Sequence, residues 1–245
     1  MKEWIYGRNA VFETLRANRR RVYRLRTAEG LKASPQLQQA IDLARSRILP
    51  IEEVPRRELD GLEANHQGVA LQVDEYIYSD LWEMLEKAKG STTPPFFLLL
   101  DTLQDPQNLG TLLRTAEAVG VHGVILPQRR TATVTPAVVN ASSGACEHLL
   151  IGQHNLAQAI EELKQANIWV IGLEGGVDAQ PLGQVRLDGP LAVVVGSEGE
   201  GMRRLVRESC DVLMSLPMRG QVASLNAAVA GSIALYLAWQ ARGFK

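Results

Sequence analysis

The sequence predicts an α/β protein: a mostly parallel sheet with helices on both faces, preceded by a small N-terminal α/β domain. Three observations support this fold class. From Phe96 onward, short apolar runs alternate with helical patterns. The runs have the composition of strands buried on both faces, as in parallel sheets. Three polar, glycine-containing segments lie near the ends of such runs, which is where open α/β sheets place their binding sites.

The N-terminal part, residues 1–73, is predicted as a separate domain of short elements. Helical periodicity covers residues 7–17 and 35–45, and strands are expected at 22–25, 48–51 and 69–73. Residues 74–95 change character and are predicted as a linker. They comprise an extended stretch, a short helix over 80–88, and the segment Gly90-Ser91-Thr92-Thr93-Pro94-Pro95.

The remaining residues, 96–245, are predicted as the second domain. Strands are expected at 96–100, 123–126, 168–173, 191–195 and 212–216. Helices are expected at 109–119, 135–141, 156–167, 202–209 and 225–241. The last helix carries one stripe at helical spacing, which indicates core or a subunit interface: Leu225, Ala228, Val229, Ser232, Ile233, Tyr236 and Leu237.

Composition favours a globular protein of the cytoplasm. The chain has 245 residues, of which 46% are hydrophobic and 22% charged. Its first residues lack the apolar core of a signal peptide, and the longest apolar stretch, 227–239, is too short for a bilayer. Cys146 and Cys210 are expected to be free thiols, and the four histidines lack zinc-site spacing, so no metal is predicted.

The net charge of −1 does not itself indicate a nucleic-acid partner. The basic residues are nevertheless concentrated: residues 16–26 contain six arginines and no acid. A guanidinium bonds phosphate through a planar fork, so this cluster could hold an RNA backbone. A solvated helix end and turn explains the same run equally well, and the pattern alone leaves both interpretations open.

The first glycine-containing segment combines Asn108, Gly110 and Arg114. Asn108 occupies a position suited to a helix cap. Gly110 weakens the first helical turn, which suggests that something approaches the backbone there. Arg114 lies one turn further on, where it suits recognition of phosphate or carboxylate; a surface salt bridge is the alternative.

The second segment follows the strand at 191–195 and contains Gly196, Glu198, Gly199 and Gly201. The glycine order does not match the dinucleotide fingerprint, and no phosphate-binding P-loop occurs. Glycine permits positive φ angles and close approach of the backbone to a flat ligand. Glu198 between these glycines is predicted to accept hydrogen bonds from a ligand or to orient an arginine, rather than to be a solvated turn residue.

The third segment runs from Leu216 to Asn226. Ser224 is a candidate cap of the final helix, whereas Asn226 within the first turn has poor helix propensity and suggests a functional task. Leu216, Met218 and Leu225 could offer an apolar wall to an adenine ring.

Together the three segments resemble the SpoU (TrmH-type) branch of the SPOUT RNA methyltransferases. The matching residues are Asn108-Leu109-Gly110 with Arg114, the run from Val195 to Met202, and Leu216-Pro217-Met218 with Ser224-Leu225-Asn226. The N-terminal motifs at 6–11 and 66–70 resemble the small L7Ae/L30e-like substrate-binding domain of that family. This arrangement is most similar to the 23S rRNA guanosine 2′-O-ribose methyltransferases.

The resemblance implies a deep trefoil knot in residues 96–245, S-adenosylmethionine as methyl donor, and a cytoplasmic homodimer that acts on RNA. The implied donor-binding residues are Leu173, Gly196, Gly201, Leu216, Met218, Ser224 and Leu225. The implied catalytic residues are Arg114, Asn108, Glu198, Ser224 and Asn226. RNA contacts are expected from Arg8, Arg19, Arg20, Arg21 and Arg114.

Three alternative functions each account for part of the sequence. A nicotinamide-dependent dehydrogenase requires an ordered glycine fingerprint, which this chain lacks. A non-catalytic RNA-binding protein would account for the arginines but not for Arg114, Glu198 and Asn226 as a set. Within the methyltransferases, tRNA is the alternative substrate, because the N-terminal domain favours rRNA only by analogy.

Overall fold

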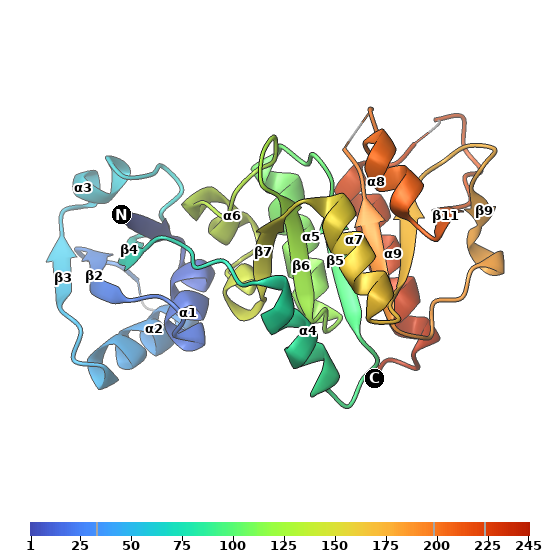
Figure 1. Cartoon of the computed structure of the whole chain (residues 1–245). Helices are drawn as coiled ribbons and strands as arrows, with labels where there is room; N and C mark the ends of the chain where they lie inside the picture. The colour runs from blue at the N-terminus through green and yellow to red at the C-terminus, as the bar shows by residue number, and fades with distance from the viewer. Residues whose placement is uncertain (33, 198, 223) are drawn as a thin grey trace. The chain divides into compact units, whose positions relative to one another are not determined.

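Two β-sheets organise the chain in the computed structural model, which describes residues 1–32, 34–197, 199–222 and 224–245 (Figure 1). Each sheet belongs to its own compact unit. The N-terminal unit comprises Met1–Ile77 and Thr133–His148, and the C-terminal unit comprises Tyr78–Ala132 and Leu149–Lys245.

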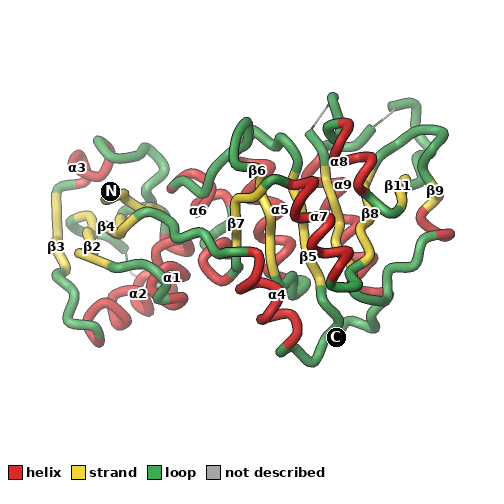
Figure 2. Tube along the Cα trace, viewed as in Figure 1, coloured by secondary structure: helices red, strands yellow, loops and turns green. Residues whose placement is uncertain are grey.

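The N-terminal unit has a four-stranded sheet in the order β1-β4-β2-β3 (Figure 2). Strand β4 is antiparallel to β1 and β2, and β3 is parallel to β2. Its elements are β1 (Lys2–Tyr6), α1 (Arg8–Ala17), β2 (Val22–Ala28), α2 (Pro35–Ser46), β3 (Ile51–Val54), α3 (Arg56–Asp60), β4 (Val69–Asp74), α6 (Pro136–Ala141) and the 3-10 helix η1 (Ala145–His148). The strand predicted at 48–51 begins only at Ile51, because Ile48 has a left-handed φ of 56° and Pro50 precedes the strand.

The C-terminal unit contains a seven-stranded sheet in the order β7-β6-β5-β10-β8-β11-β9. Every neighbouring pair is parallel, which confirms the predicted sheet type. Its elements are α4 (Leu81–Lys89), β5 (Phe96–Leu100), α5 (Pro106–Ala118), β6 (Gly123–Pro127), β7 (Ile151–His154), α7 (Leu156–Gln165), β8 (Trp169–Leu173), β9 (Gln180–Pro181), η2 (Leu182–Gln184), β10 (Leu191–Val195), α8 (Arg204–Ser209), β11 (Val212–Ser215) and α9 (Ala227–Ala241).

Helices cover both faces of this sheet (Figure 1). On one face, α4, α7 and α8 bury Met84, Ile160 and Val206 in a common core with the strands. On the other face, α9 packs against α5 and β10. Gly231 permits this close packing, because a Cβ there would lie 2.6 Å from the Leu112 side chain.

Helix α9 is apolar around its whole circumference. Ala228, Leu235 and Ala238 are buried, whereas Val229, Ile233 and Tyr236 are 39–47% exposed. Of the predicted apolar stripe only Ala228 is buried, so most of the stripe lies on the exposed side of the helix, and Leu235 and Ala238 outside the stripe supply the core contacts. Within the described ranges, none of the helices combines the length and the apolar character needed to cross a membrane.

The compact units differ from the predicted domain boundaries at two places. Helix α4, expected in a linker, is buried in the core of the C-terminal unit through Leu81, Met84 and Ala88. Residues 133–148, which connect β6 to β7, belong to the N-terminal unit. Asn140 holds this segment there by donating a hydrogen bond of 3.0 Å to the Tyr6 carbonyl oxygen.

A buried ion pair makes the second attachment. The Arg20 side chain is 1% exposed and lies 2.6 Å from a carboxylate oxygen of Glu147, which is fully buried. Arg20 also pairs with Glu3 on β1. Burial raises the pKa of Glu147, and the opposing charge of Arg20 only partly offsets that effect. The neighbouring Cys146 is a free thiol, as is Cys210, and burial raises the pKa of each to about 12.

Removal of one partner of this pair should strongly destabilise the N-terminal unit. Glu147→Ala leaves Glu3 as the remaining carboxylate paired with the buried Arg20 guanidinium. Breaking a buried ion pair in this way costs about 3–5 kcal/mol of folding free energy. The control Asp42→Ala removes an exposed partner of Arg45 on α2 and should cost at most about 1 kcal/mol. Hydrogen exchange of residues 1–28 across a urea series measures both changes. A loss below about 1 kcal/mol for Glu147→Ala would contradict the assigned role of the pair.

Candidate active site

A cavity of about 510 Å³ lies at the carboxyl ends of three neighbouring strands, β10, β8 and β11. Leu173 ends β8, Val195 ends β10, and Leu216 directly follows β11. The cavity is lined by all of the residues predicted to bind a donor: Leu173, Gly196, Gly201, Leu216, Met218, Ser224 and Leu225. Such a crevice at the carboxyl edge is where parallel sheets bind ligands.

The glycine-rich turn presents its backbone to this cavity. Ser197 and Gly201 exchange two backbone hydrogen bonds of 3.1 Å, which close the turn into a small loop. Gly199 and Gly201 have φ angles of 84° and 69°, which glycine adopts without strain. A Cβ on Gly196 would collide with the backbone of Gly201 and Met202, 2.6 Å from the Gly201 carbonyl oxygen. Glu198, predicted as a site residue, lies outside the described residues.

Asp101 fixes the far end of this turn. Its carboxylate is fully buried at the end of β5 and accepts hydrogen bonds of 2.7 Å from the backbone nitrogen and the Nε atom of Arg203. The Asp101 backbone nitrogen in turn donates to the Val195 carbonyl oxygen at 2.8 Å. Neither Asp101 nor Arg203 is among the predicted site residues, although a carboxylate directly after the apolar run 96–100 is a usable signal.

Glu174 is a second carboxylate missed by sequence analysis. It follows β8, lines the cavity, and accepts a hydrogen bond of 3.0 Å from Nε of Arg207 through Oε1. Its Oε2 atom is buried and has no hydrogen-bond partner within the described part of the chain. A buried acceptor without a partner is costly, so a hydroxyl or amino group of a ligand would stabilise it.

Asn226 connects the first and third glycine-containing segments. Its Oδ1 accepts hydrogen bonds from the backbone nitrogens of Ala228 and Val229, and its Nδ2 donates to Oδ1 of Asn108 at 3.1 Å. Asn226, and not Ser224, is therefore the cap of the final helix. The cap of α5 is Asp105, which accepts from the Gln107 nitrogen, and Asn108 lies inside the first turn. Helix α5 begins at Pro106 rather than at the predicted residue 109, because proline favours the first position of a helix.

Arg114 lies on α5, one helical turn after Gly110, and its side chain is exposed. It is not among the residues that line the cavity. Asn226 and Ser224 do line it, whereas Asn108 joins it through the hydrogen bond to Asn226. The structure thus places the predicted donor-binding residues together and leaves Arg114 accessible to a large substrate.

The arginines predicted to bind RNA have different environments. Arg20 is buried in its ion pairs with Glu147 and Glu3, so it is a structural residue and the RNA contact predicted for it is wrong. Arg8 donates to the backbone oxygens of Gln67 and Lys32, and Arg19 lies over the Tyr76 ring. Arg21 is exposed and lies over the Tyr23 ring, 5.2 Å from its centroid.

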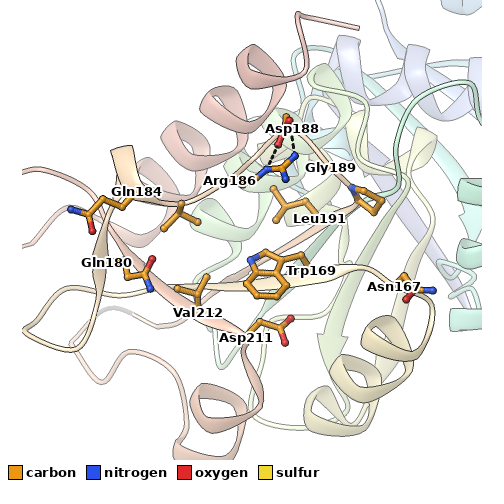
Figure 3. Close-up of a pocket in the computed structure, with 12 residues that line it drawn as sticks. Asn167, Trp169, Gln180, Gln184, Arg186, Asp188, Gly189, Leu191, Asp211 and Val212 are labelled. Atoms are coloured by element: carbon orange, nitrogen blue, oxygen red, sulfur yellow. Dashed lines mark hydrogen bonds and ion pairs between the residues drawn. The ribbon is translucent and has the colours of Figure 1, made fainter.

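A larger cavity of about 600 Å³ lies at the opposite, amino-terminal ends of the same strands (Figure 3). Trp169 at the start of β8 lies near its centre, and Arg186 and Asp188 form an ion pair at its edge. None of the predicted site residues lines it. We therefore assign the active site to the smaller cavity, which combines the end of β8, the glycine-rich turn and the third segment, and which the first segment reaches through the Asn108–Asn226 hydrogen bond. No group of three potential metal ligands occurs within the described ranges.

Comparisons with known proteins identify the family of both parts of the chain. The SpoU rRNA Methylase family matches residues 95–236, and the RNA 2′-O ribose methyltransferase substrate-binding family matches residues 4–79. The chain is 45% identical to YacO of Bacillus subtilis, a protein assigned to the TrmH family of tRNA/rRNA methyltransferases, with 98% of this chain and 96% of YacO covered. It is 41% identical to the 23S rRNA (guanosine-2′-O-)-methyltransferase RlmB of Pseudomonas putida, with 99% and 98% covered.

Solved structures show the same architecture. An RNA 2′-O ribose methyltransferase crystal structure aligns with a TM-score of 0.78 at 25% identity, covering 98% of this chain and 89% of the other. The SpoU methyltransferase AviRb from Streptomyces viridochromogenes, solved in complex with AdoMet, aligns with a TM-score of 0.81 at 22% identity, covering 100% and 92%. Together, the family matches, the full-length relatives and the shared fold show that this chain is an RNA 2′-O-ribose methyltransferase of the SpoU family.

Proposed function

We propose that this enzyme methylates the ribose 2′-hydroxyl of a guanosine in 23S rRNA, with S-adenosylmethionine as methyl donor. The observation that carries the donor assignment is the convergence of the end of β8, the glycine-rich turn and the third segment on one cavity at the carboxyl edge of the sheet. The rRNA assignment is supported by the RlmB relative, whose similarity extends over both units. The alternative, a guanosine of tRNA, is supported by the broader description of YacO as a tRNA/rRNA methyltransferase.

The residues of the cavity fit the donor chemically. Leu216, Met218 and Leu225 supply apolar contact for an adenine ring, and Gly196 lets the backbone of the glycine-rich turn pack closely beside it at the edge of the cavity. The Oε2 atom of Glu174 is a ready acceptor for a ribose hydroxyl or an ammonium group. When bound, S-adenosylmethionine supplies an electrophilic methyl group on a positively charged sulfur.

The chain's own residues then position the RNA ribose. In the transfer, the ribose oxygen forms a bond to the methyl carbon while the carbon–sulfur bond breaks, and the hydroxyl proton passes to a base or solvent. Placement of the oxygen in line with the donor supplies much of the acceleration. A guanidinium is almost never deprotonated in proteins, so we do not assign the role of base to Arg114. We assign it to the phosphate beside the target ribose and to the charge that develops on the oxygen.

Asn108, Asn226, Ser224 and Glu198 complete the proposed catalytic set. The Asn226–Asn108 hydrogen bond ties the start of α9 to the first turn of α5, the helix that carries Arg114. This link would fix the position of Arg114 relative to the donor. Ser224 lines the same cavity and is assigned to orientation of the donor or the ribose.

We further infer a cytoplasmic homodimer with a knotted C-terminal unit. The exposed side of α9, with Val229, Ile233 and Tyr236, is an apolar surface suited to a second copy of the chain. The trefoil knot follows from family resemblance, and the cavity lined by three separate chain segments is compatible with it. Sedimentation of a single-chain mass at micromolar concentration would contradict the dimer.

The substrate proposal predicts where a labelled methyl group appears. Incubation with tritiated S-adenosylmethionine and total bacterial RNA lacking the modification should place the label in 23S rRNA as 2′-O-methylguanosine, identified by nuclease mapping. Label in tRNA would replace the rRNA proposal by the tRNA alternative. Absence of label from all RNA would contradict both.

The role of Arg114 predicts a specific kinetic change. Arg114→Lys keeps the charge but loses the planar fork, so kcat should fall by about 10²-fold while donor affinity stays within about twofold. The matched control Arg45→Lys changes an exposed arginine on α2 and should leave both constants unchanged. Near-normal turnover of Arg114→Lys across pH 6–9 would rule out the fork geometry as the basis of catalysis.

Gly196 predicts a loss of donor binding. In Gly196→Ala the added methyl group collides with backbone of the glycine-rich turn, so calorimetry should show donor affinity reduced by at least about tenfold. Gly183→Ala is the control, because its Cβ meets nothing within 4 Å and its φ is not positive. Equal donor affinity in the two variants would contradict the proposed contact.

A further inference from the structure

One face of the four-stranded sheet in the N-terminal unit is polar, aromatic and basic. Strand register places Trp4, Gln72 and Arg24 in one row across β1, β4 and β2. The next row contains Arg26 on β2 beside Glu52 on β3. We call this surface the open sheet face and define it by Lys2, Trp4, Arg21, Tyr23, Arg24, Arg26, Glu52, Gln72 and Asp74.

The opposite face of the same sheet carries an apolar core. Ile5, Leu25, Leu71 and Val73 are fully buried there, where α1 and α2 pack on the strands. Leu59 of α3 covers one end of the open sheet face, together with Ala28, Val54 and Ala70, and Trp4 packs against this cluster. Helices therefore supply the core on one side, whereas the residues that define the other side are half-buried or exposed.

Cations lie over the aromatic rings of the open sheet face. The guanidinium of Arg26 is 4.9 Å from the centroid of the Trp4 ring. The Lys2 ammonium is 3.7 Å from the centroid of the Tyr23 ring, and Arg21 approaches the same ring at 5.2 Å. Unpaired RNA bases stack both on aromatic rings and on guanidinium planes, so these pairs are suited to single-stranded RNA.

A shared carboxylate holds two arginines side by side. Glu52 accepts hydrogen bonds of 2.9 Å from Arg24 and 2.8 Å from Arg26, and these bonds lower its pKa. Arg24 also donates to Gln72 at 2.9 Å, and the Tyr23 hydroxyl donates to Asp74 at 2.8 Å. Four cations face two carboxylates on this surface, which leaves an excess of positive charge suited to a phosphate backbone.

We propose that the open sheet face binds an unpaired stretch of the RNA substrate. Bases stack on the Trp4–Arg26 pair and on Tyr23, while Lys2, Arg21 and Arg24 contact phosphates. The proposal rests on the proposed function, because it assumes that RNA is the substrate delivered to the active site. It goes further by assigning recognition to this face, away from the buried Arg20 and the backbone-bonded Arg8.

The electrostatic part is tested by neutralising the paired arginines in the full-length protein. Arg24→Gln/Arg26→Gln/Glu52→Gln removes both guanidiniums together with their shared carboxylate, so no unpaired charge remains. RNA affinity at 100 mM salt should fall by about tenfold, and the slope of log Kd against log salt should decrease by about 0.7, the value for the one phosphate contact that Arg24 makes with single-stranded RNA. KM for RNA should rise while kcat at saturating RNA and donor affinity stay unchanged. Arg45→Gln/Arg47→Gln, at the end of α2, is the control and should retain wild-type affinity.

The stacking part is tested at Tyr23. Tyr23→Phe keeps the ring and should bind RNA within about twofold of wild type, whereas Tyr23→Leu should bind at least about fivefold more weakly. RNA that carries 4-thiouridine should crosslink to peptides containing residues 2–6 and 21–26. Crosslinks confined to other peptides, or wild-type RNA affinity in the triple variant, would overturn the proposal. If the wild-type enzyme itself neither binds nor methylates RNA, the proposed function fails instead.

Discussion

The candidate active site depends on one buried carboxylate. Asp101 directly follows β5 and accepts hydrogen bonds from both the backbone and the side chain of Arg203, at the far end of the glycine-rich turn. This contact joins the end of one strand to the loop that leaves its neighbour β10. Because the turn contains three glycines, it has little conformational preference of its own. The ion pair therefore supplies the rigidity that the turn's sequence lacks, and the backbone surface of the cavity follows from it.

A structural element can be predicted from the sequence when the interactions that determine it are local. The strands Phe96–Leu100 and Leu191–Val195 were predicted to the residue, because both faces of a central parallel strand are apolar. Strand Lys2–Tyr6 was missed, since its charged positions at the edge of a sheet hide the alternation. The residues proposed to bind the donor share one cavity because strand ends meet at one sheet edge, which is a topological property.

Most differences between the predicted and the observed roles of residues arise from interaction partners that are distant in the sequence. Arg20 belongs to a basic run that suggests phosphate contacts, but its partner Glu147 lies 127 residues away and only the fold brings them together. Glu174 and Asp101 gain their roles from Arg207 and Arg203 in the same manner. Asn226 was expected inside a helix and instead begins it, because its side chain satisfies the backbone nitrogens that a helix start leaves open. Helix propensity alone does not distinguish a residue that caps the start of a helix from one inside its first turn.

The insertion of residues 133–148 into the N-terminal unit affects how the protein is made. A ribosome synthesises β1 to β4 long before Glu147, so the nascent chain holds Arg20 without its main counter-charge while β5, α5 and β6 emerge. The N-terminal sheet can form early, but it reaches its full stability only after translation has passed His148. The N-terminal unit is thus the first to begin folding, but it depends on residues 133–148, which are translated in the middle of the C-terminal unit.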